Sequence, residues 1–376
     1  MAIQLFVPTF DVENCLSEIR ECLEKGWTGM GFKTVEFEEK WKQYTSMPNA
    51  YYLASATAGL NLTFDILKEG YCWQDGDEVI TTPMTFISSN HAILLANLKP
   101  VFADIDDTLC LDPESVRSHI TEKTKAVLYV GLGGNTGKYE EIVKICKENN
   151  LKLVLDAAHM AGTRLHGEIP GREAEAVNYS FQAVKNLPTA DSGMLCFKEE
   201  RFDKIARRKA WLGINKDTYS RSTGGNYKWR YDVEYVGNKY HGNSVVAAIG
   251  IAQLPHLDKD NAYRRQIASW YDQLLMPHKD KITFITIPEG CESARHLYQI
   301  MIDDRDGLMA YLNEHEIYPG VHYVDNTQYR MYAYAAGTCP KASYASDHLL
   351  SLPMHMRLTY EDIKNIAGCI IDYLNK

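Results

Sequence analysis

The chain has 376 residues, of which 45% are hydrophobic and 24% are charged. This composition predicts a globular protein with enough apolar residues for a large core and for two domains. The formal net charge of −9 argues against nucleic acid or an anionic membrane as the main partner, because binding to either depends on clustered Lys and Arg side chains.

The nine cysteines are an odd number and form no C-x-x-C pair, which indicates reduced thiols in a reducing compartment. The first residues lack the basic and apolar regions of a signal peptide, and no apolar run approaches the roughly 18 residues that span a bilayer. We therefore expect a cytoplasmic protein that does not bind a membrane.

Helix and strand patterns alternate through the first two-thirds of the chain. Two helices are expected first, one over residues 11–26 and a second around Phe37, Trp41 and Tyr44. Strand-like runs separated by helical patterns follow at residues 78–82, 100–104, 126–130, 151–156, 177–181 and 194–197. This order predicts an α/β domain with a mainly parallel central sheet flanked by helices.

The pattern changes after about residue 254. Strand-like runs at 282–285 and 296–302, with helical patterns at 307–315 and 361–374, predict a smaller α+β unit. We therefore expect a large domain over residues 1–253, which includes the N-terminal helical segment, and a small C-terminal domain over residues 254–376.

Asp156 is the last residue of the apolar strand predicted at 151–156. Ligands of open α/β sheets bind beyond the carboxyl ends of the strands, so this carboxylate is expected in the binding crevice. The alternative is an Asp that caps the following turn. His159 could stack on a bound ring or serve a structural role, and Phe86, which follows another strand, could cover a ring or lie in the core.

Lys185 lies in a largely uncharged stretch. Partial burial and a nearby cationic cofactor would lower its pKa and free the amine for imine formation, although most lysines lie in solvent. An amine that forms an imine and a carboxylate that keeps a ring nitrogen protonated are the two protein groups that pyridoxal phosphate (PLP) chemistry requires. Lys185 and Asp156 can supply both, so PLP is the predicted cofactor.

Small and hydroxyl residues in the run 53–62 begin a predicted helix. The free N–H groups of a helix N-terminus bind anions, and the small side chains around Ala56 and Thr57 would let a phosphate approach the backbone. The alternative is an ordinary N-cap by Ser55 or Thr57. Ser180, near another predicted strand end, offers a further hydroxyl to a phosphate.

The glycine-rich run 131–138 looks like a nucleotide-binding loop. However, Leu132 occupies the first glycine of the Walker spacing, Tyr139 replaces its Ser/Thr, and Thr136 breaks the G-x-G-x-x-G pattern. We expect a flexible active-site loop here. The histidines and cysteines show no zinc-like spacing, so no metal site is predicted.

Together these segments resemble the DegT/StrS family of PLP-dependent sugar aminotransferases, which have the fold-type-I architecture of aspartate aminotransferase. The resemblance covers nearly the whole chain. The matching motifs lie at residues 55–60, 76–80 with 85–86, 156–159, 180–185, 236–243 with 247–254, and 320–323 with 350–354.

The resemblance implies roles for individual residues. Lys185 would bind the cofactor as an imine, Asp156 would pair with its pyridine nitrogen, and Thr57 and Ser180 would hold its phosphate. Phe86 would cover the ring. These assignments make Lys185 the expected catalytic residue.

The resemblance also implies a homodimer with a shared active site, in which Lys239 from the partner subunit reaches the phosphate. Many family members have Asn at that position, and a lysine would add a full positive charge. Two further departures, Asp191-Ser192-Gly193 for the usual E-G-G and Gly242 for the usual Met, suggest a pocket that admits a differently shaped sugar.

The expected reaction is transfer of an amino group from glutamate to a keto sugar, nucleotide-linked, in the synthesis of a surface glycan such as an O-antigen. A dehydratase branch of the family has His at the lysine position, so Lys185 favours amino transfer. Three alternatives remain open: an acceptor that is a free keto sugar acid or a keto-cyclitol, a PLP-dependent dehydratase or lyase, and a PLP-fold protein that acts as a transcriptional or structural partner.

Overall fold

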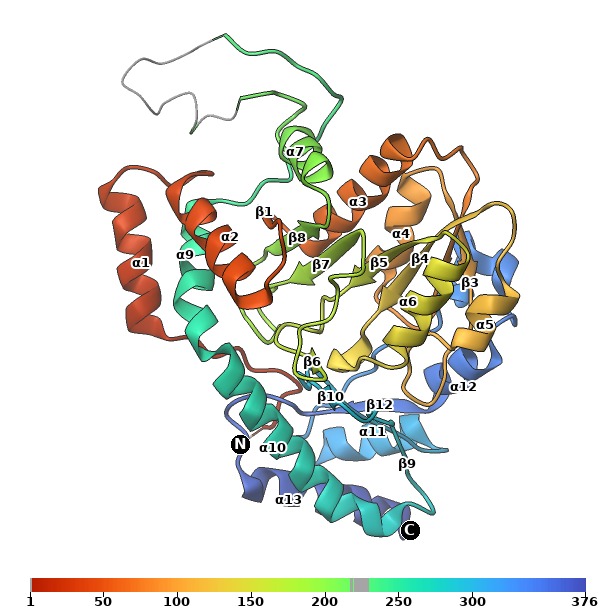
Figure 1. The fold of residues 1–376 in the computed structure, drawn as a ribbon. Helices are drawn as coiled ribbons and strands as arrows, with labels where there is room; N and C mark the ends of the chain where they lie inside the picture. Colours follow the sequence, from red (N-terminus) through yellow and green to blue (C-terminus); the bar gives the residue numbers. More distant parts are fainter. Residues whose placement is uncertain (1, 217–218, 220–229) are drawn as a thin grey trace.

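A seven-stranded sheet forms the centre of the computed structural model, which describes residues 2–216, 219 and 230–376 (Figure 1). Its strands are β1 (Tyr51–Leu53), β2 (Glu78–Thr81), β3 (Lys99–Phe102), β4 (Thr124–Val130), β5 (Lys152–Asp156), β7 (Ala176–Ser180) and β8 (Gly193–Phe197). They lie in the order β1-β8-β7-β5-β4-β2-β3. Strand β8 pairs antiparallel with both β1 and β7, and the other pairs are parallel, so the predicted mainly parallel sheet is confirmed.

Helices cover both faces of this sheet. They are α1 (Val12–Glu24), α2 (Phe32–Thr45), α3 (Ala56–Gly70), α4 (Ile87–Leu95), α5 (Pro113–Ser118), α6 (Tyr139–Glu148), α7 (Glu200–Lys209) and α9 (Ser244–Gln253). Helices α2, α5, α6 and α9 contribute to the core on one face, where Phe37 and Trp41 are fully buried. Helices α3, α4 and α7 contribute to the core on the other face, with Phe64 from α3 and Phe202 from α7. Because both faces are covered, the strands are apolar throughout rather than alternating.

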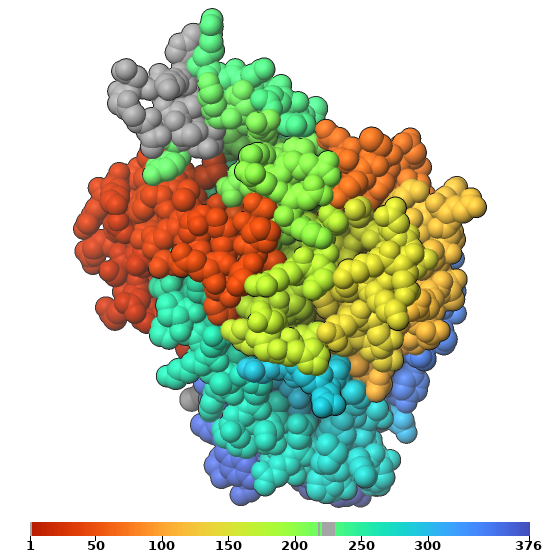
Figure 2. Space-filling view, in the orientation of Figure 1, coloured from red at the N-terminus to blue at the C-terminus, as the bar shows by residue number. Residues whose placement is uncertain are grey.

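The C-terminal residues form a separate hydrophobic core. Its elements are α10 (Leu257–Leu275), β9 (Thr283–Phe284), β11 (Tyr298–Met301), α11 (Arg305–Glu314), β12 (Leu349–Leu352) and α13 (Tyr360–Leu374). Helix α12 (Pro340–His348) packs instead in a cluster with Phe102 of β3. Strands β12, β11 and β9 make a three-stranded antiparallel sheet. Figure 2 shows these residues, cyan to blue, as a mass continuous with the rest of the molecule. We propose that the two domains divide after Gln253, where α9 ends.

The first residues of the chain pack with the C-terminal core, although the sequence prediction assigned them to the large domain. Ile3 belongs to the same cluster as Ile300, and its N–H donates to the carbonyl of Glu316 at 2.8 Å. The chain then passes to α1, which packs against α9. This path brings Phe6 to the boundary between the two units.

The segment 131–138 is not the flexible loop that was expected. Leu132 and Thr136 are buried, and the side chain of Asn135 donates to the carbonyls of Thr108 and Thr286 at 3.1 and 2.8 Å. Gly133 has a φ of 66°, a conformation that glycine adopts without strain. The glycines therefore allow a tight, buried turn rather than movement.

Among the described residues, none of the helices combines the length and the apolar character that crossing a membrane would need.

Candidate active site

A cavity of about 520 Å³ lies beyond the carboxyl ends of the parallel strands. Asp156 and Ser180 are the last residues of β5 and β7, and both line it. The other expected site residues of this chain that line it are Ala56, Thr57, Phe86, His159 and Lys185. The fold therefore brings together seven side chains that are far apart in the sequence, as expected for a parallel sheet.

Asp156 is a buried carboxylate with two donors. Its Oδ2 accepts a hydrogen bond from the Ser89 hydroxyl at 2.7 Å, and its Oδ1 accepts one from the Ala158 N–H at 3.1 Å. Burial raises the pKa of Asp156, while these donors and the Lys185 charge act in the opposite direction. No ion pair among the described residues includes Asp156. A buried anion in this position would be stabilised by a cationic partner inside the cavity.

Lys185 follows β7 in a turn closed by a 2.8 Å hydrogen bond from its N–H to the Gln182 carbonyl. Burial lowers the pKa of its amine to about 8, and the charge of Asp156 opposes that shift. The uncharged form of the amine, which a nucleophile requires, is therefore far more populated near neutral pH than in an ordinary lysine.

The N-terminus of α3 also opens onto the cavity. Ser55 is its N-cap, and the Ser55 hydroxyl accepts a hydrogen bond from the Ala58 N–H at 3.1 Å. The capping alternative is thus correct for Ser55. The N–H groups of Ala56 and Thr57 precede this capped position and lack partners within the helix. With the Ser180 hydroxyl nearby in the cavity wall, they form a set of donors suited to an anion.

Aromatic rings form another wall of the cavity. His159 Nδ1 accepts a hydrogen bond from the Gly133 N–H at 3.2 Å, and its Nε2 lies 3.2 Å from the Tyr323 hydroxyl. Burial, with the Lys185 charge, lowers the pKa of His159 well below its ordinary value. The ring is therefore neutral. Phe86 lies at the mouth, 5.9 Å from the Tyr323 ring centroid.

A model of the DegT/DnrJ/EryC1/StrS aminotransferase family matches residues 10–371 of this chain. The chain belongs to this family. The uncharacterized protein MJ1066 of Methanocaldococcus jannaschii is 31% identical over 385 residues, which is 98% of each chain. The structure is similar to the aminotransferase TlmJ from Streptoalloteichus hindustanus, with 29% identity, 100% and 99% of the two chains covered, and a TM-score of 0.91. It is also similar to Spr1654 from Streptococcus pneumoniae in its PLP form, with 28% identity, coverage of 98% and 97%, and a TM-score of 0.88.

This family member is thus a PLP-dependent aminotransferase with the predicted fold-type-I architecture. Spr1654 has been solved in a PLP form and a PMP form. The residues of the cavity suit that cofactor, because a buried carboxylate, a reactive amine and the N–H groups of a helix end face one space. They match a pyridine nitrogen, an aldehyde and a phosphate, respectively.

Gly193 fixes the distance between β8 and the α3 N-terminus. A Cβ at this position would lie 2.5 Å from the Ala56 nitrogen and 2.7 Å from the Ser55 carbonyl carbon, and such backbone atoms cannot move without shifting the helix end. We expect Gly193→Ala to weaken PLP binding by on the order of tenfold or more, because the N–H donors move away from the phosphate. Fluorescence titration of the cofactor-free protein measures this.

The matched control is Gly368→Ala in α13, where a Cβ would meet no atom within 4 Å. That variant should bind PLP as the wild type does. Unchanged PLP affinity in Gly193→Ala would show that this close approach does not position the phosphate site.

Lys239 does not line the cavity of its own chain. It forms an isolated β-bridge with Trp211, and its Nζ lies 5.6 Å from the Trp211 ring centroid. Its expected contact with the phosphate of a partner subunit stays a prediction.

The sequence did not identify three residues that the fold brings to this site. Ser89 reaches Asp156 from the first turn of α4, and the segment before α1 brings Phe6 to the cavity. His296 also lines the cavity, although the sequence suggested only a strand around it. None of them lies in a local pattern that signals a ligand; only the tertiary fold brings them here.

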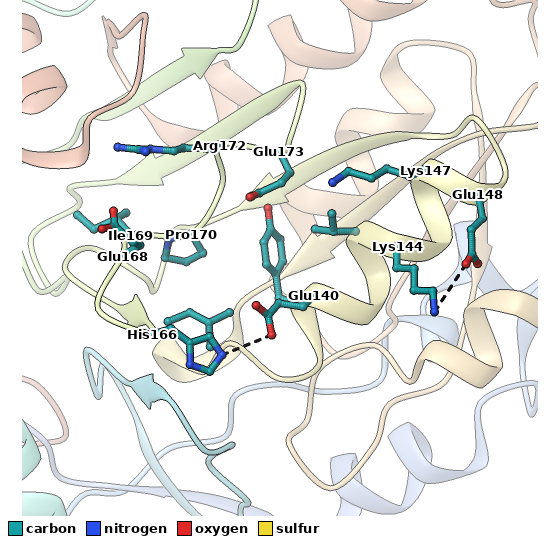
Figure 3. Close-up of a pocket in the computed structure, with 13 residues that line it drawn as sticks. Glu140, Lys144, Lys147, Glu148, His166, Glu168, Ile169, Pro170, Arg172 and Glu173 are labelled. Carbon is teal, nitrogen blue, oxygen red and sulfur yellow. Dashed lines mark ion pairs between the residues drawn. The ribbon is translucent and has the colours of Figure 1, made fainter.

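A second hollow of about 630 Å³ lies beside α6 and the segment 165–173. Figure 3 shows charged side chains around it, with ion pairs of Glu140 with His166 at 3.5 Å and of Lys144 with Glu148 at 3.9 Å. None of the predicted site residues lines this hollow. Its rim combines charges of both signs and, unlike the first cavity, contains neither Lys185 nor Asp156.

Proposed function

We propose that this aminotransferase moves the amino group of glutamate to a nucleotide-linked keto sugar. The observation that carries the proposal is that Lys185 and Asp156 line one cavity, where burial lowers the pKa of the lysine amine to about 8. The family supports a sugar as the acceptor. We further propose that the amino sugar enters a surface glycan.

PLP, when bound, supplies an electron sink for the charge that develops at the amino acid α-carbon. The Asp156 carboxylate would hold a proton on the pyridine nitrogen, and Ser89 and Ala158 orient that carboxylate. Lys185 Nζ would accept the proton from the α-carbon and return it in the second half of the reaction. The N–H groups of Ala56 and Thr57, with the Ser180 hydroxyl, would hold the phosphate.

We also propose that the active enzyme is a homodimer with a shared site. Phe86 lines the cavity, and 56% of it is exposed in the single chain, an apolar surface that binding of the cofactor and of a second subunit would cover. A second subunit would cover it and would bring its own Lys239 toward the phosphate.

A substrate panel tests the proposal. The protein is incubated with glutamate and with dTDP- and UDP-linked 4-keto-6-deoxyhexoses, the keto-cyclitol scyllo-inosose, or a free eight-carbon keto sugar acid, and 2-oxoglutarate is measured. We expect 2-oxoglutarate to form with a nucleotide-linked sugar. If only the free sugar acid or the cyclitol is converted, that compound is the acceptor and the nucleotide-linked sugar is not. Sugar conversion without glutamate consumption would indicate a dehydratase or lyase, and a protein that takes up no PLP would indicate a non-enzymatic role.

The lysine pKa predicts how cofactor uptake depends on pH. Only the uncharged amine attacks an aldehyde, so the rate should rise as the pH passes through about 8. Between pH 7 and pH 9 the uncharged fraction rises from about 10% to about 90%. Stopped-flow absorbance of the cofactor-free protein mixed with PLP measures the rate. A midpoint near the ordinary lysine value of 10.5 would contradict the proposed environment of Lys185.

A further inference from the structure

His296 lies in the wall of the active cavity and is 1% exposed. Its ring is stacked on Phe6, with centroids 5.4 Å apart and an interplanar angle of 7°. The His159 ring centroid is also close, at 4.3 Å. Packing against these two rings leaves the buried His296 side chain little freedom to rotate, so the direction of its nitrogens is fixed.

Two buried amides set the direction of a hydrogen-bonded chain that ends at His296. The Asn261 Nδ2 donates to the carbonyl of Ala161 at 2.8 Å, and a carbonyl can only accept. The Asn261 Oδ1 therefore accepts, from Asn186 Nδ2 at 2.7 Å. The same Asn186 nitrogen donates its second hydrogen to the carbonyl of Ala294 at 2.7 Å.

The side-chain oxygen of Asn186 can only accept a hydrogen bond, and it determines the tautomer of His296. Asn186 Oδ1 lies 3.0 Å from His296 Nδ1, so Nδ1 must carry the hydrogen. Burial, with the charges of neighbouring groups including Lys185, lowers the pKa of His296 well below its ordinary value. The ring is neutral, and a neutral ring protonated on Nδ1 has a lone pair on Nε2. Among the described residues, no hydrogen bond involves this Nε2.

The adjacent His159 has the opposite tautomer. The Gly133 N–H donates to its Nδ1, so its hydrogen lies on Nε2 and points to the Tyr323 oxygen. One histidine therefore donates and the other accepts, although their rings are in contact. The tautomer of His296 follows, through the two amides, from the carbonyl of Ala161, which can only accept. The tautomer of His159 follows from the N–H of Gly133, which can only donate. The fold therefore determines both.

We propose that His296 is a specificity-determining residue of the keto-sugar subsite, and that its Nε2 accepts a hydrogen bond from a hydroxyl group of the sugar. The assignment rests on the proposed function. Beyond its reacting amine, glutamate offers only carboxylates, which accept hydrogen bonds and cannot donate to Nε2. A sugar offers hydroxyls that donate. His296 should therefore affect the sugar half of the reaction and not the glutamate half.

The variant His296→Phe keeps a ring in contact with Phe6 and His159 and removes both nitrogens. We expect kcat/KM for the keto sugar of the panel with the highest wild-type rate to fall by about 10- to 100-fold, the usual effect of losing one buried hydrogen bond to substrate. The change should lie mainly in KM. The spectral change on adding glutamate alone should keep its rate within about twofold, and the absorption spectrum of bound PLP should be unchanged.

The outcomes separate this assignment from the proposed function. A wild-type KM for the keto sugar in His296→Phe would overturn the role of His296 alone. Equal losses in both half-reactions would also overturn it, because they would make Lys185 or the cofactor the partner of Nε2. If the wild type takes the amino group of glutamate but converts no keto sugar of the panel, the proposed function fails and the assignment fails with it.

Nitrogen NMR of histidine-labelled protein tests the tautomer directly and does not depend on activity. Wild type should show His296 protonated on Nδ1 only. Asn186→Leu removes the acceptor for that hydrogen, so the preference for Nδ1 should be lost and KM for the sugar should rise. The control His91→Phe changes a histidine bonded to Tyr332 outside the cavity and should leave both readouts unchanged. A hydrogen on His296 Nε2 in the wild type would overturn the proposal.

Discussion

Replacing Lys185 with alanine is expected to lower aminotransferase turnover by on the order of 10⁴-fold, because the variant loses both the amine that bonds to the cofactor and the base that moves the proton. Lys185 lines the cavity with Asp156, and burial lowers the pKa of its amine to about 8. Steady-state formation of 2-oxoglutarate from glutamate measures the loss. The visible absorption band of the bound cofactor should change in the same variant, because its aldehyde is no longer linked to the protein.

Two controls make this result specific. Lys144→Ala removes a lysine that is 70% exposed and lies by the second hollow, and it should keep wild-type turnover. Added methylamine should restore part of the activity of Lys185→Ala, since a small amine can enter the emptied space and act as the base. Turnover of Lys185→Ala within tenfold of the wild type would remove the central assumption of the proposed mechanism.

The parts of the site that local sequence predicted are those determined by one strand end or one helix start. Asp156 closes an apolar run, and a parallel strand that ends in a carboxylate points it into the crevice whatever the rest of the chain does. Thr57 lies in the first turn of a helix among small residues, and Lys185 follows a strand in an uncharged segment. The neighbours of each position made it a candidate, and the resemblance to the family supplied its expected role.

The remaining parts depend on contacts between distant segments. Asn261 of α10 donates and accepts hydrogen bonds beside Lys185, where it contacts Asn186, and no hydrophobic periodicity or sequence motif links two such positions. The same limit explains the glycine-rich run at 131–138, where glycine composition indicates backbone freedom but cannot distinguish a mobile loop from a tight buried turn. It also explains Ile3, whose partners in the C-terminal core come from the other end of the chain.

Asp156→Asn is expected to lower turnover by about 100- to 1,000-fold while the fold is retained. Asparagine has nearly the shape of aspartate, and Ser89 and Ala158 can still bond to a polar side chain. The negative charge is lost, however, so the pyridine nitrogen no longer holds its proton and the cofactor withdraws electrons less strongly. Rapid mixing with glutamate, followed by absorbance, isolates this step from later ones.

The same substitution has a second effect with a defined sign. The charge of Asp156 raises the pKa of Lys185 against the larger effect of burial, so removing that charge should lower the pKa further below about 8. The midpoint of PLP uptake against pH should therefore move to lower pH in Asp156→Asn, even though turnover falls. Asp280→Asn, an exposed position, should change neither quantity. A midpoint that stays in place or rises would mean that Asp156 and Lys185 do not interact through the cavity, and a twofold or smaller change in turnover would mean that the carboxylate does not serve the cofactor.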